Sequence, residues 1–346
     1  MRARRVTLKT VAESVGVSVN TASRALAGKD AVSEETRALV REEAERLGYV
    51  RNSMARSLVL GNAMTLGMVI THPANPFYAT LISAVEEWSR AYGYSLLLMV
   101  TEENLGTEQN AAEELLRWGV DGAVVIPVQE GAEHWRRLQD SGVPIVLVNR
   151  NLPELECDFV GVDHEAGAYK AAAHLLDADP ATVYLLEEDS ALSSVSDRVT
   201  GYRRALRERG RAADNGSIAL IPAPQRKSRE LPWEPADAYE RSRELLPRLG
   251  SGTSVMTGND YFALSLYRAL SESGIKVPEQ VAVLGFGDYP FSAYLSPPLT
   301  SVRLRAAEIG TMAVDLLVRR VKEMSPSAGP ESIYLESDLE VRNSTR

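Results

Sequence analysis

The sequence predicts a small all-α head joined to a larger, two-lobed α/β body. Three observations predict this fold class. The first 50 residues contain three short amphipathic helical patterns, and residues 65–286 alternate between short apolar strands and helical segments. The length of 346 residues also exceeds what one hydrophobic core ordinarily holds. An apolar share of 45% and a charged share of 25% are typical of a globular chain.

Charge is distributed unevenly along the chain. Residues 1–60 contain eleven Lys and Arg against seven Asp and Glu, whereas residues 61–346 contain 27 against 40. The formal charge of −9 by itself argues against a nucleic-acid binder. A basic head on an acidic body, however, is the pattern expected when only the head contacts a polyanion.

Targeting and redox signals are few. No apolar run approaches the ~20 residues that cross a bilayer, and Lys9, Glu13 and Asn20 interrupt any signal-peptide core. The single cysteine, Cys157, excludes a disulfide framework and a Cys-based zinc site, and we expect it to be half-buried. We therefore expect a cytoplasmic protein.

The head, residues 1–50, has the cap and spacing pattern of a helix-turn-helix. Thr7 can cap a first helix, and Gly16 ends that helix where a positive φ suits glycine. Ser18 can cap a second helix. A third helix is expected from Ser33 to Leu47, with acidic residues in its first turn and a glycine after its end.

The second helix presents a polar outer face, and its N-terminal end is the part that enters the major groove in this motif. Asn20 can recognise adenine, Val19 can contact a thymine methyl group, and Arg24 can bind guanine or phosphate. The other side chains of this face suit phosphate oxygens: Ser18, Thr21 and Ser23. The alternative is the solvated face of an ordinary three-helix cap.

Residues 6–25, VTLKTVAESVGVSVNTASRA, resemble the opening of the lactose-repressor (LacI) family of bacterial regulators, and further matches follow at 32–33, 36–37, 47–49 and 55–58. The resemblance implies a sequence-specific transcriptional repressor that binds pseudo-palindromic double-stranded operator DNA as a homodimer, associated with the nucleoid through that DNA. It also implies a periplasmic-binding-protein-like (type I) body that binds a small-molecule effector.

By the same resemblance, residues 51–62 are a hinge helix that becomes ordered when two copies meet on DNA. Asn52 and Ala55 would then contact DNA, Ala55 in the minor groove, and Leu58 would be a wedge that unstacks the central base step. Alternatively, Leu58 packs on the body as a linker anchor.

The body, residues 63–346, is expected to form two parallel sheets. The resemblance divides it into an N-lobe, 63–162 and 292–324, and a C-lobe, 163–291 and 325–346, with crossovers near 162–164, 290–293 and 324–326. Expected strands are 65–70, 94–100, 122–127, 144–149, 182–187, 217–221, 254–257 and 281–286, and expected helices are 77–92, 108–118, 132–141, 164–177, 197–209, 237–249 and 261–273.

Polar and aromatic residues at the strand ends suit a small polar ligand, because ligands of such folds bind beyond the carboxyl ends of the strands. Asn259 could instead only cap a helix, and Trp233 could be loop packing. The effector-binding residues that the resemblance implies are Phe77, Tyr78, Asn149, Arg198, Trp233, Asn259 and Asp288.

The chain departs from the family at Gly287, where relatives often have an aspartate that contacts the ligand. The loss of that aspartate carboxylate would open space in the binding site and favour an acidic or phosphorylated effector, unless water or Asp288 takes the role of the missing carboxylate. We expect a sugar, sugar acid or sugar phosphate. Residues 187–189 are expected to be a solvated charge run, and residues 81–85 to lie in the dimer contact.

Two other classes are considered, an α/β sugar-metabolising enzyme and a stand-alone sugar-binding protein. The sequence lacks the phosphate-loop, dinucleotide, nucleophile-elbow and zinc-protease motifs, and its four histidines share no metal-ligand spacing. We therefore predict no catalytic residue, metal ligand or cofactor. Residues 6–60 and the missing export signal oppose the stand-alone binding protein.

Overall fold

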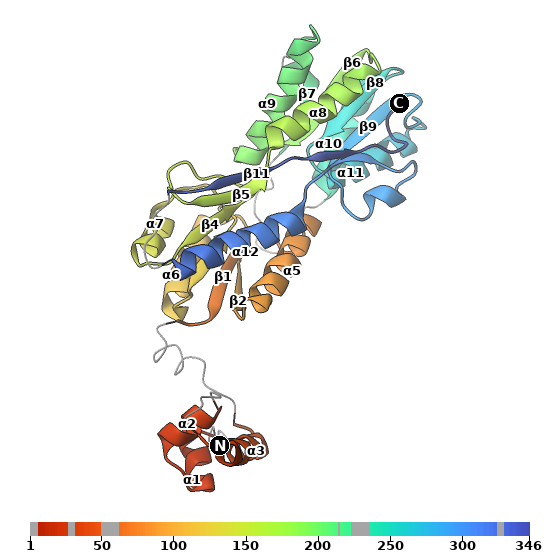
Figure 1. Cartoon of the computed structure of the whole chain (residues 1–346). Helices are drawn as coiled ribbons and strands as arrows, with labels where there is room; N and C mark the ends of the chain where they lie inside the picture. Colours follow the sequence, from red (N-terminus) through yellow and green to blue (C-terminus); the bar gives the residue numbers. More distant parts are fainter. Residues whose placement is uncertain (1–5, 27–31, 50–61, 214, 223–234, 324–328) are drawn as a thin grey trace. The chain divides into compact units, whose positions relative to one another are not determined.

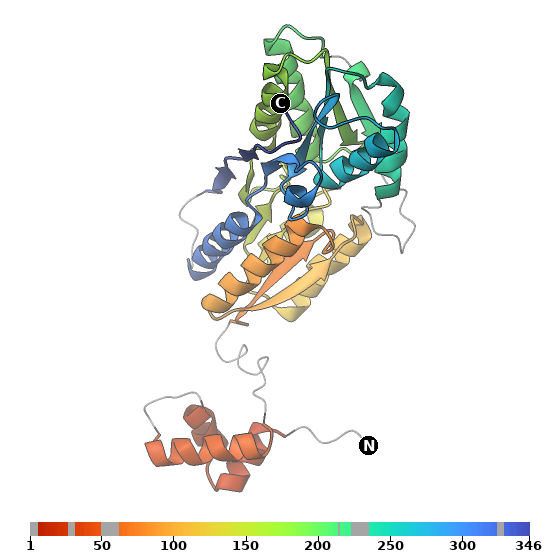
Figure 2. The ribbon, with the colours of Figure 1, turned by 90° about the vertical axis from the view of Figure 1, so that its right-hand side faces the viewer.

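The computed structural model describes residues 6–26, 32–49, 62–213, 215–222, 235–323 and 329–346. The chain divides into two compact units, residues 1–63 and 64–346, which we describe separately as the head and the body. Figures 1 and 2 show the ribbon from two directions.

Three helices form the head: α1 (Leu8–Val15), α2 (Val19–Leu26) and α3 (Glu34–Arg46). Thr7 caps α1 through a capping box, and Gly16 ends that helix with a φ of 74°. The Ser18 and Ser33 hydroxyls accept hydrogen bonds at the starts of α2 and α3. The helices enclose a small core of Val11, Ala12, Ala22, Ala25, Val40 and Ala44. The predicted helix-turn-helix is confirmed.

The body contains two six-stranded sheets, one in each lobe (Figure 1). The first has the order β11-β5-β4-β3-β1-β2 and the second β12-β10-β9-β8-β6-β7. The first-lobe strands are β1 (Thr65–Ile70), β2 (Ser95–Val100), β3 (Gly122–Val125), β4 (Ile145–Val148), β5 (Asp158–Val162) and β11 (Ser332–Leu335). The second-lobe strands are β6 (Thr182–Glu188), β7 (Ile218–Ile221), β8 (Thr253–Thr257), β9 (Val281–Gly287), β10 (Thr300–Arg303) and β12 (Asp338–Glu340).

Helices cover both sheets, and Figure 2 shows the orange and yellow first lobe separate from the green and cyan second lobe. The first lobe has α5 (Pro76–Ala91), α6 (Leu105–Trp118), α7 (Glu133–Asp140) and α12 (Ala306–Lys322). The second has α8 (His164–Asp177), α9 (Ser193–Glu208), α10 (Pro235–Leu245) and α11 (Asp260–Glu272), with 3-10 turns η1 (Asn215–Ser217), η2 (Leu246–Arg248) and η3 (Ser292–Tyr294). All described strand pairs are parallel except β10 with β12.

The chain crosses between the lobes three times, and two of the expected crossovers were wrong. The first, at 162–164, agrees with the structure. Residues 290–293 instead lead to β10, whose Thr300 pairs with Leu284 in the second sheet. The real second crossover therefore follows β10, at 304–305. The third lies at 336–337, because β11 pairs with β5 of the first sheet. Proline-rich segments indicate turns, but they do not determine which sheet the next strand joins.

Helices α5 and α12 pack side by side over one face of the first sheet (Figure 1). Leu81 and Val85 of α5 point into this core and are fully buried. A Cβ at Gly310 would lie 2.9 Å from the Ala84 Cβ, which shows how closely the helices approach. Leu81 and Val85 therefore stabilise the lobe itself, so within the stretch 81–85 only Ser83, which is exposed, and the half-buried Ile82 and Ala84 could take part in the expected dimer contact.

Among the described residues, no helix combines the length and the apolar character needed to cross a bilayer. The same part of the chain brings no three His, Cys, Asp or Glu side chains together as a group able to hold a metal ion.

The close packing of α8 on α9 gives a stability prediction. A Cβ at Gly201 would lie 2.1 Å from the Glu165 backbone oxygen and 2.8 Å from the Tyr169 nitrogen. Backbone atoms cannot move aside cheaply, so Gly201→Ala should lower the free energy of unfolding by ~1–3 kcal/mol in urea titrations. Gly250→Ala is the control, because a Cβ there meets nothing within 4 Å. Equal stability of the two variants would contradict this packing.

Candidate functional site

A cleft of about 520 Å³ lies at the carboxyl ends of the strands, between the two lobes. The start of α5 and the end of β4 line it from the first lobe, and the end of β6, the starts of α9 and α11 and the end of β9 line it from the second. The lining residues are Asn75, Phe77, Tyr78, Asn149, Arg150, His164, Glu188, Leu192, Ser194, Arg198, Gly258, Asn259, Phe262, Phe286, Tyr289 and Leu304.

Five of the residues expected to bind an effector come together in this cleft: Phe77, Tyr78, Asn149, Arg198 and Asn259. Trp233 lies outside the described residues. Asp288 does not line the cleft. Its carboxylate is bound by Arg303, at 2.9 Å, and by Arg342, at 2.6 Å.

Aromatic rings supply apolar surface on both sides of the cleft. The Phe77 and Tyr78 rings meet edge to face with centroids 5.4 Å apart. Across from them, the Phe286 ring stacks on His164 at 5.9 Å and lies under the Arg198 guanidinium at 5.4 Å. Flat apolar faces of this kind suit the C–H surface of a sugar or another small ring.

Arg198 is held by a carboxylate of its own chain. Its Nε and Nη2 donate to the two oxygens of Glu187 at 2.8 and 3.0 Å, and both side chains are buried. The Glu187 side chain is fully buried and that of Glu188 is half-buried, so the expectation of a solvated charge run at 187–189 was wrong for these two residues, whereas Asp189 is exposed. Glu187 and Glu188 are the last two residues of β6, a strand of a parallel sheet, and Arg198 of α9 pairs with Glu187.

Arg150 has a matching arrangement in the first lobe. It donates two hydrogen bonds to the Glu103 carboxylate, at 2.8 and 2.6 Å, and a third to the Pro127 carbonyl. The Arg150 cation lowers the pKa of Glu103 against the opposing effect of burial, so the carboxylate stays ionised. Both guanidinium groups of the cleft are therefore neutralised by carboxylates of the protein.

His164 lies at the first crossover and is buried. Burial and the nearby cations Arg198 and Arg150 lower the pKa of its imidazole to about 3, so the ring is neutral near pH 7. Its Nε2 lies 3.0 Å from Asn149 Oδ1, which places the proton on Nε2. Nδ1 is then a buried acceptor without a hydrogen-bond partner among the described residues.

Tyr289 connects the lobes through a chain of hydrogen bonds. Its hydroxyl accepts from Asn259 Nδ2 at 3.1 Å and donates to Asn75 Oδ1 at 3.0 Å, and Asn75 belongs to the first lobe. Burial and the Asp260 carboxylate raise the pKa of Tyr289, so it keeps its proton. A second bridge joins Gln129 of the first lobe to Ser193 of the second through two 3.0 Å hydrogen bonds.

Gly287 makes room for the Tyr289 ring. The glycine has a φ of 135°, and a Cβ there would lie 2.7 Å from Tyr289 Cε1. The space that an aspartate side chain would need is therefore filled, and the expectation that Gly287 opens the cleft was wrong. The sequence alone shows the glycine but not the ring that occupies its place.

Sequence reasoning also missed several lining residues. Asn75 and Arg150 belong to the strand-end runs 75–78 and 149–150 that the pattern marked as suited to a polar ligand, but they were not selected as effector-binding residues. Glu188 could have been found as the last residue of a buried strand. His164 and Tyr289 had no comparable signal, because only the folded lobes bring them to the cleft.

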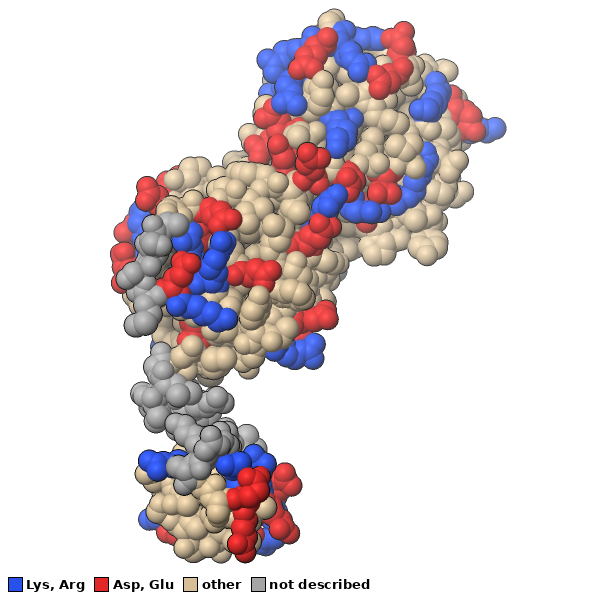
Figure 3. All heavy atoms as spheres, viewed as in Figure 1, with Lys and Arg blue, Asp and Glu red and all other residues tan. Residues whose placement is uncertain are grey.

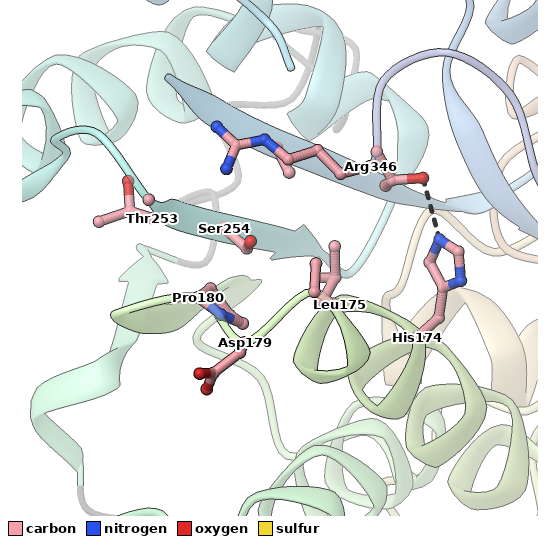
Figure 4. A pocket seen from close by; sticks show the side chains of 11 residues that line it. His174, Leu175, Asp179, Pro180, Thr253, Ser254 and Arg346 are labelled. Carbon is pink, nitrogen blue, oxygen red and sulfur yellow. Dashed lines mark hydrogen bonds between the residues drawn. The ribbon is translucent and has the colours of Figure 1, made fainter. Parts of the chain in front are cut away.

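A second hollow, of about 350 Å³, lies in the second lobe (Figure 4). It is formed by the end of α8, the amino end of β8 and the last residues of the chain. His174 contacts the Thr345 hydroxyl there at 2.9 Å, and the Arg346 guanidinium donates to the Pro278 and Glu279 carbonyls. Ligands of open parallel sheets bind at the carboxyl ends of the strands, so the cleft between the lobes is the better candidate.

The head provides a separate candidate interface on α2. Ala22 and Ala25 are buried, which turns the opposite face of the helix outward. Ser18, Val19, Asn20, Ser23 and Arg24 are exposed there, and Thr21 is half-buried. The helix contains no acidic residue, whereas α3 contains five glutamates, and acidic side chains gather on one side of the head in Figure 3. Asn52, Ala55 and Leu58 lie outside the described residues.

A helix-turn-helix head combined with a cleft between two α/β lobes defines a class of DNA-binding regulators with a ligand-binding body. Residues 7–52 match the family described as bacterial regulatory proteins of the lacI family, and residues 172–345 match the periplasmic binding protein-like domain. The chain belongs to the LacI family of bacterial transcriptional regulators.

Individual relatives agree with this assignment. The HTH-type transcriptional repressor PurR of Pasteurella multocida is 28% identical over 341 residues, which cover 98% of each chain. A transcriptional regulator CelR–cellobiose complex is 27% identical with a TM-score of 0.72, covering 98% of this chain and 100% of that one. The lac repressor dimer bound to operator and the anti-inducer ONPF shares the fold, with 22% identity, a TM-score of 0.85 and 99% of each chain covered. The chain is thus a regulator and not an enzyme.

The buried Arg198–Glu187 pair gives a second stability prediction. Glu187→Gln removes the charge that compensates a buried guanidinium, so the free energy of unfolding of the body should fall by ~3–5 kcal/mol in denaturant titrations. Glu272→Gln is the control. Its carboxylate pairs with Arg268 at 2.9 Å on the surface, where loss of an ion pair should change stability little. Similar losses in both variants would show that Glu187 is not needed to compensate Arg198.

Proposed function

We propose that this protein is a transcriptional repressor that binds a pseudo-palindromic operator as a homodimer, and that a small molecule in the cleft controls its operator affinity. The observation that carries the proposal is the exposed face of α2. Val19, Asn20 and Arg24 project from a helix whose opposite face is buried in the head. These side chains match the donors, acceptors and methyl contacts of base edges in the major groove.

The names of the relatives support the same proposal. PurR is named a repressor, the lac repressor structure is a dimer bound to operator DNA, and the CelR complex contains cellobiose. Two recognition helices of a dimer would enter successive major grooves, with Ser18, Thr21 and Ser23 on phosphates. Asn52, Ala55 and Leu58 would contact the central minor groove, where Leu58 would unstack a base step. Such a repressor works on the chromosome, in the cytoplasm.

The first lobe offers an apolar face for the second copy. Strand β2 lies at the edge of its sheet and presents Leu98, while α5 presents Trp88 and the residue that ends it, Tyr92, is exposed beside it, all three 38–41% exposed. Trp88 Nε1 and the Tyr92 hydroxyl both donate to Asp315 Oδ1, which fixes the two rings at the surface. An exposed apolar sheet edge is a template for association, and we place the dimer contact here.

The effector would act through the bridges between the lobes. Phe77, Tyr78, Asn149, Arg198 and Asn259 would contact it, directly beside the Tyr289–Asn75 hydrogen bond. A ligand that prefers one degree of lobe closure shifts the population of that state. A coupling of ~1–3 kcal/mol would change operator affinity by roughly 5–150-fold.

A genome-wide pull-down with the full-length chain tests the function. We expect enrichment of one pseudo-palindromic sequence, and loss of that enrichment when the chain is truncated before Asn62. The truncated body is compared with the full chain in the same lysate. If the body retains every chromosomal contact, or if no palindrome is enriched, the protein is not an operator-binding repressor of this kind.

Arg24 should provide base-specific binding energy. Arg24→Ala should weaken specific operator binding by ~1–3 kcal/mol, with a loss that varies among operator variants, as measured by fluorescence anisotropy. Arg41→Ala, which removes an exposed arginine of α3, is the matched control and should change affinity little. An equal loss on all sequences would assign Arg24 to a phosphate contact.

A further inference from the structure

The balance of hydrogen-bond donors and acceptors in the cleft indicates which effector chemistry it accepts. This inference rests on the proposed function, in which the cleft holds the effector. The two arginines that line the cleft each form a bidentate pair with a buried or half-buried carboxylate, Arg198 with Glu187 and Arg150 with Glu103. An anion would have to compete with carboxylates that are already in place, at 2.6–3.0 Å.

Two acceptor groups of the cleft receive no side-chain hydrogen bond or ion pair from the described residues. The Glu188 carboxyl group lines the cleft, and the described residues supply it with no ion-pair partner. His164 Nδ1 is also buried without a donor among those residues. A buried acceptor without a partner, such as His164 Nδ1, loses hydrogen-bond energy, and it regains that energy when a ligand brings a donor.

We propose that Glu188, together with His164 Nδ1, determines the selectivity of the cleft: they accept hydrogen bonds from hydroxyl or ammonium groups of an uncharged or cationic effector, and the cleft rejects anions. The polyhydroxylated ring of a neutral sugar or an amino sugar has this chemistry. The Phe77 and Tyr78 rings provide the surfaces against which its C–H faces pack. This reverses the preference for an acidic or phosphorylated effector that Gly287 suggested.

The electrostatics of Glu188 support the proposal. Burial and the adjacent Glu187 raise the pKa of Glu188 to about 7, against the opposing effects of Arg198 and Arg150, and Glu103 adds to the rise. His164 is neutral and adds no charge. Below pH 7 the charges of the cleft therefore cancel, and above pH 7 the cleft gains a negative charge. Rejection of an anion should accordingly become stronger as the pH rises through 7.

Matched pyranoses test the proposal on the full-length protein. Glucose, glucosamine and glucuronate share one ring and differ in charge, and galactose, galactosamine and galacturonate form a second set. Thermal shift and calorimetry at pH 6 and pH 8 should show binding of an uncharged or cationic member. Any binding of the uronate should be at least about tenfold weaker and should weaken further at pH 8.

Glu188→Gln identifies the residue responsible. At pH 8, where Glu188 is ionised in the wild-type protein, the variant should bind the cationic member at least about tenfold more weakly, and it should lose the pH dependence of uronate rejection. It should bind the neutral member nearly as well, since the amide keeps an acceptor. Glu279→Gln, which changes an exposed carboxylate, is the control. If Glu188→Gln does not fold, His164→Phe is the second test variant. It keeps an aromatic ring but lacks the acceptor, so it should bind the neutral member more weakly.

Three results would each overturn the proposal. A uronate could bind more tightly than its neutral partner, no uncharged or cationic member could bind, or Glu188→Gln could keep the charge preference of the wild-type protein. Operator binding by the same samples is measured separately. If operator binding is absent in the wild-type protein, the repressor function fails, whereas the charge preference of the cleft is still decided by the sugar panel.

Discussion

The chain crosses between the lobes three times, and these crossings orient the two sheets so that the carboxyl ends of their parallel strands face one cleft. The candidate site depends on this constraint. Side chains that follow β4, β6 and β9 converge there although more than a hundred residues separate the first from the last. The lobes also exclude water from the charged groups between them. Arg198 and Arg150 are stable in such surroundings because Glu187 and Glu103 neutralise them, since a buried guanidinium without a counter-charge costs several kcal/mol.

Because the two lobes pack closely at the cleft, one residue at a strand end affects the contacts between them. Gly287 has a backbone conformation that L side chains rarely adopt, and it lets the Tyr289 ring lie where a longer side chain would extend. Tyr289 then reaches Asn75 of the opposite lobe. In the sequence, glycine at position 287 indicates the loss of a ligand contact. In the structure, the same glycine allows a contact between the lobes. The chemistry of the cleft is determined by which protein groups have already been paired.

Sequence patterns predicted most helices and strands closely. They failed where the structure is determined by which strands pair with each other. The spans 65–70 and 164–177 agree with β1 and α8, because an apolar run and a capped amphipathic pattern are local signals. The head was likewise predicted from its caps. Strands β5, β10, β11 and β12 and helix α12 were not expected. Strand β5 contains a glycine, and β11 alternates between exposed and half-buried residues. The lobe to which β10 and β11 belong depends on long-range pairing, which local patterns do not contain.

The candidate cleft residues could be predicted from one rule, that the carboxyl ends of parallel strands meet at one edge of a sheet. Their protonation states and their hydrogen-bond and ion-pair partners could be determined only from the structure. This difference bears on how the effector could act. The lobes are bridged by the Tyr289–Asn75 hydrogen bond and by the Gln129–Ser193 pair, and a net hydrogen bond contributes roughly 0.5–1.5 kcal/mol. Two such bridges have the magnitude of a typical allosteric coupling, ~1–3 kcal/mol. An effector therefore needs only to exchange these few partners, while the hydrophobic cores of both lobes remain as they are.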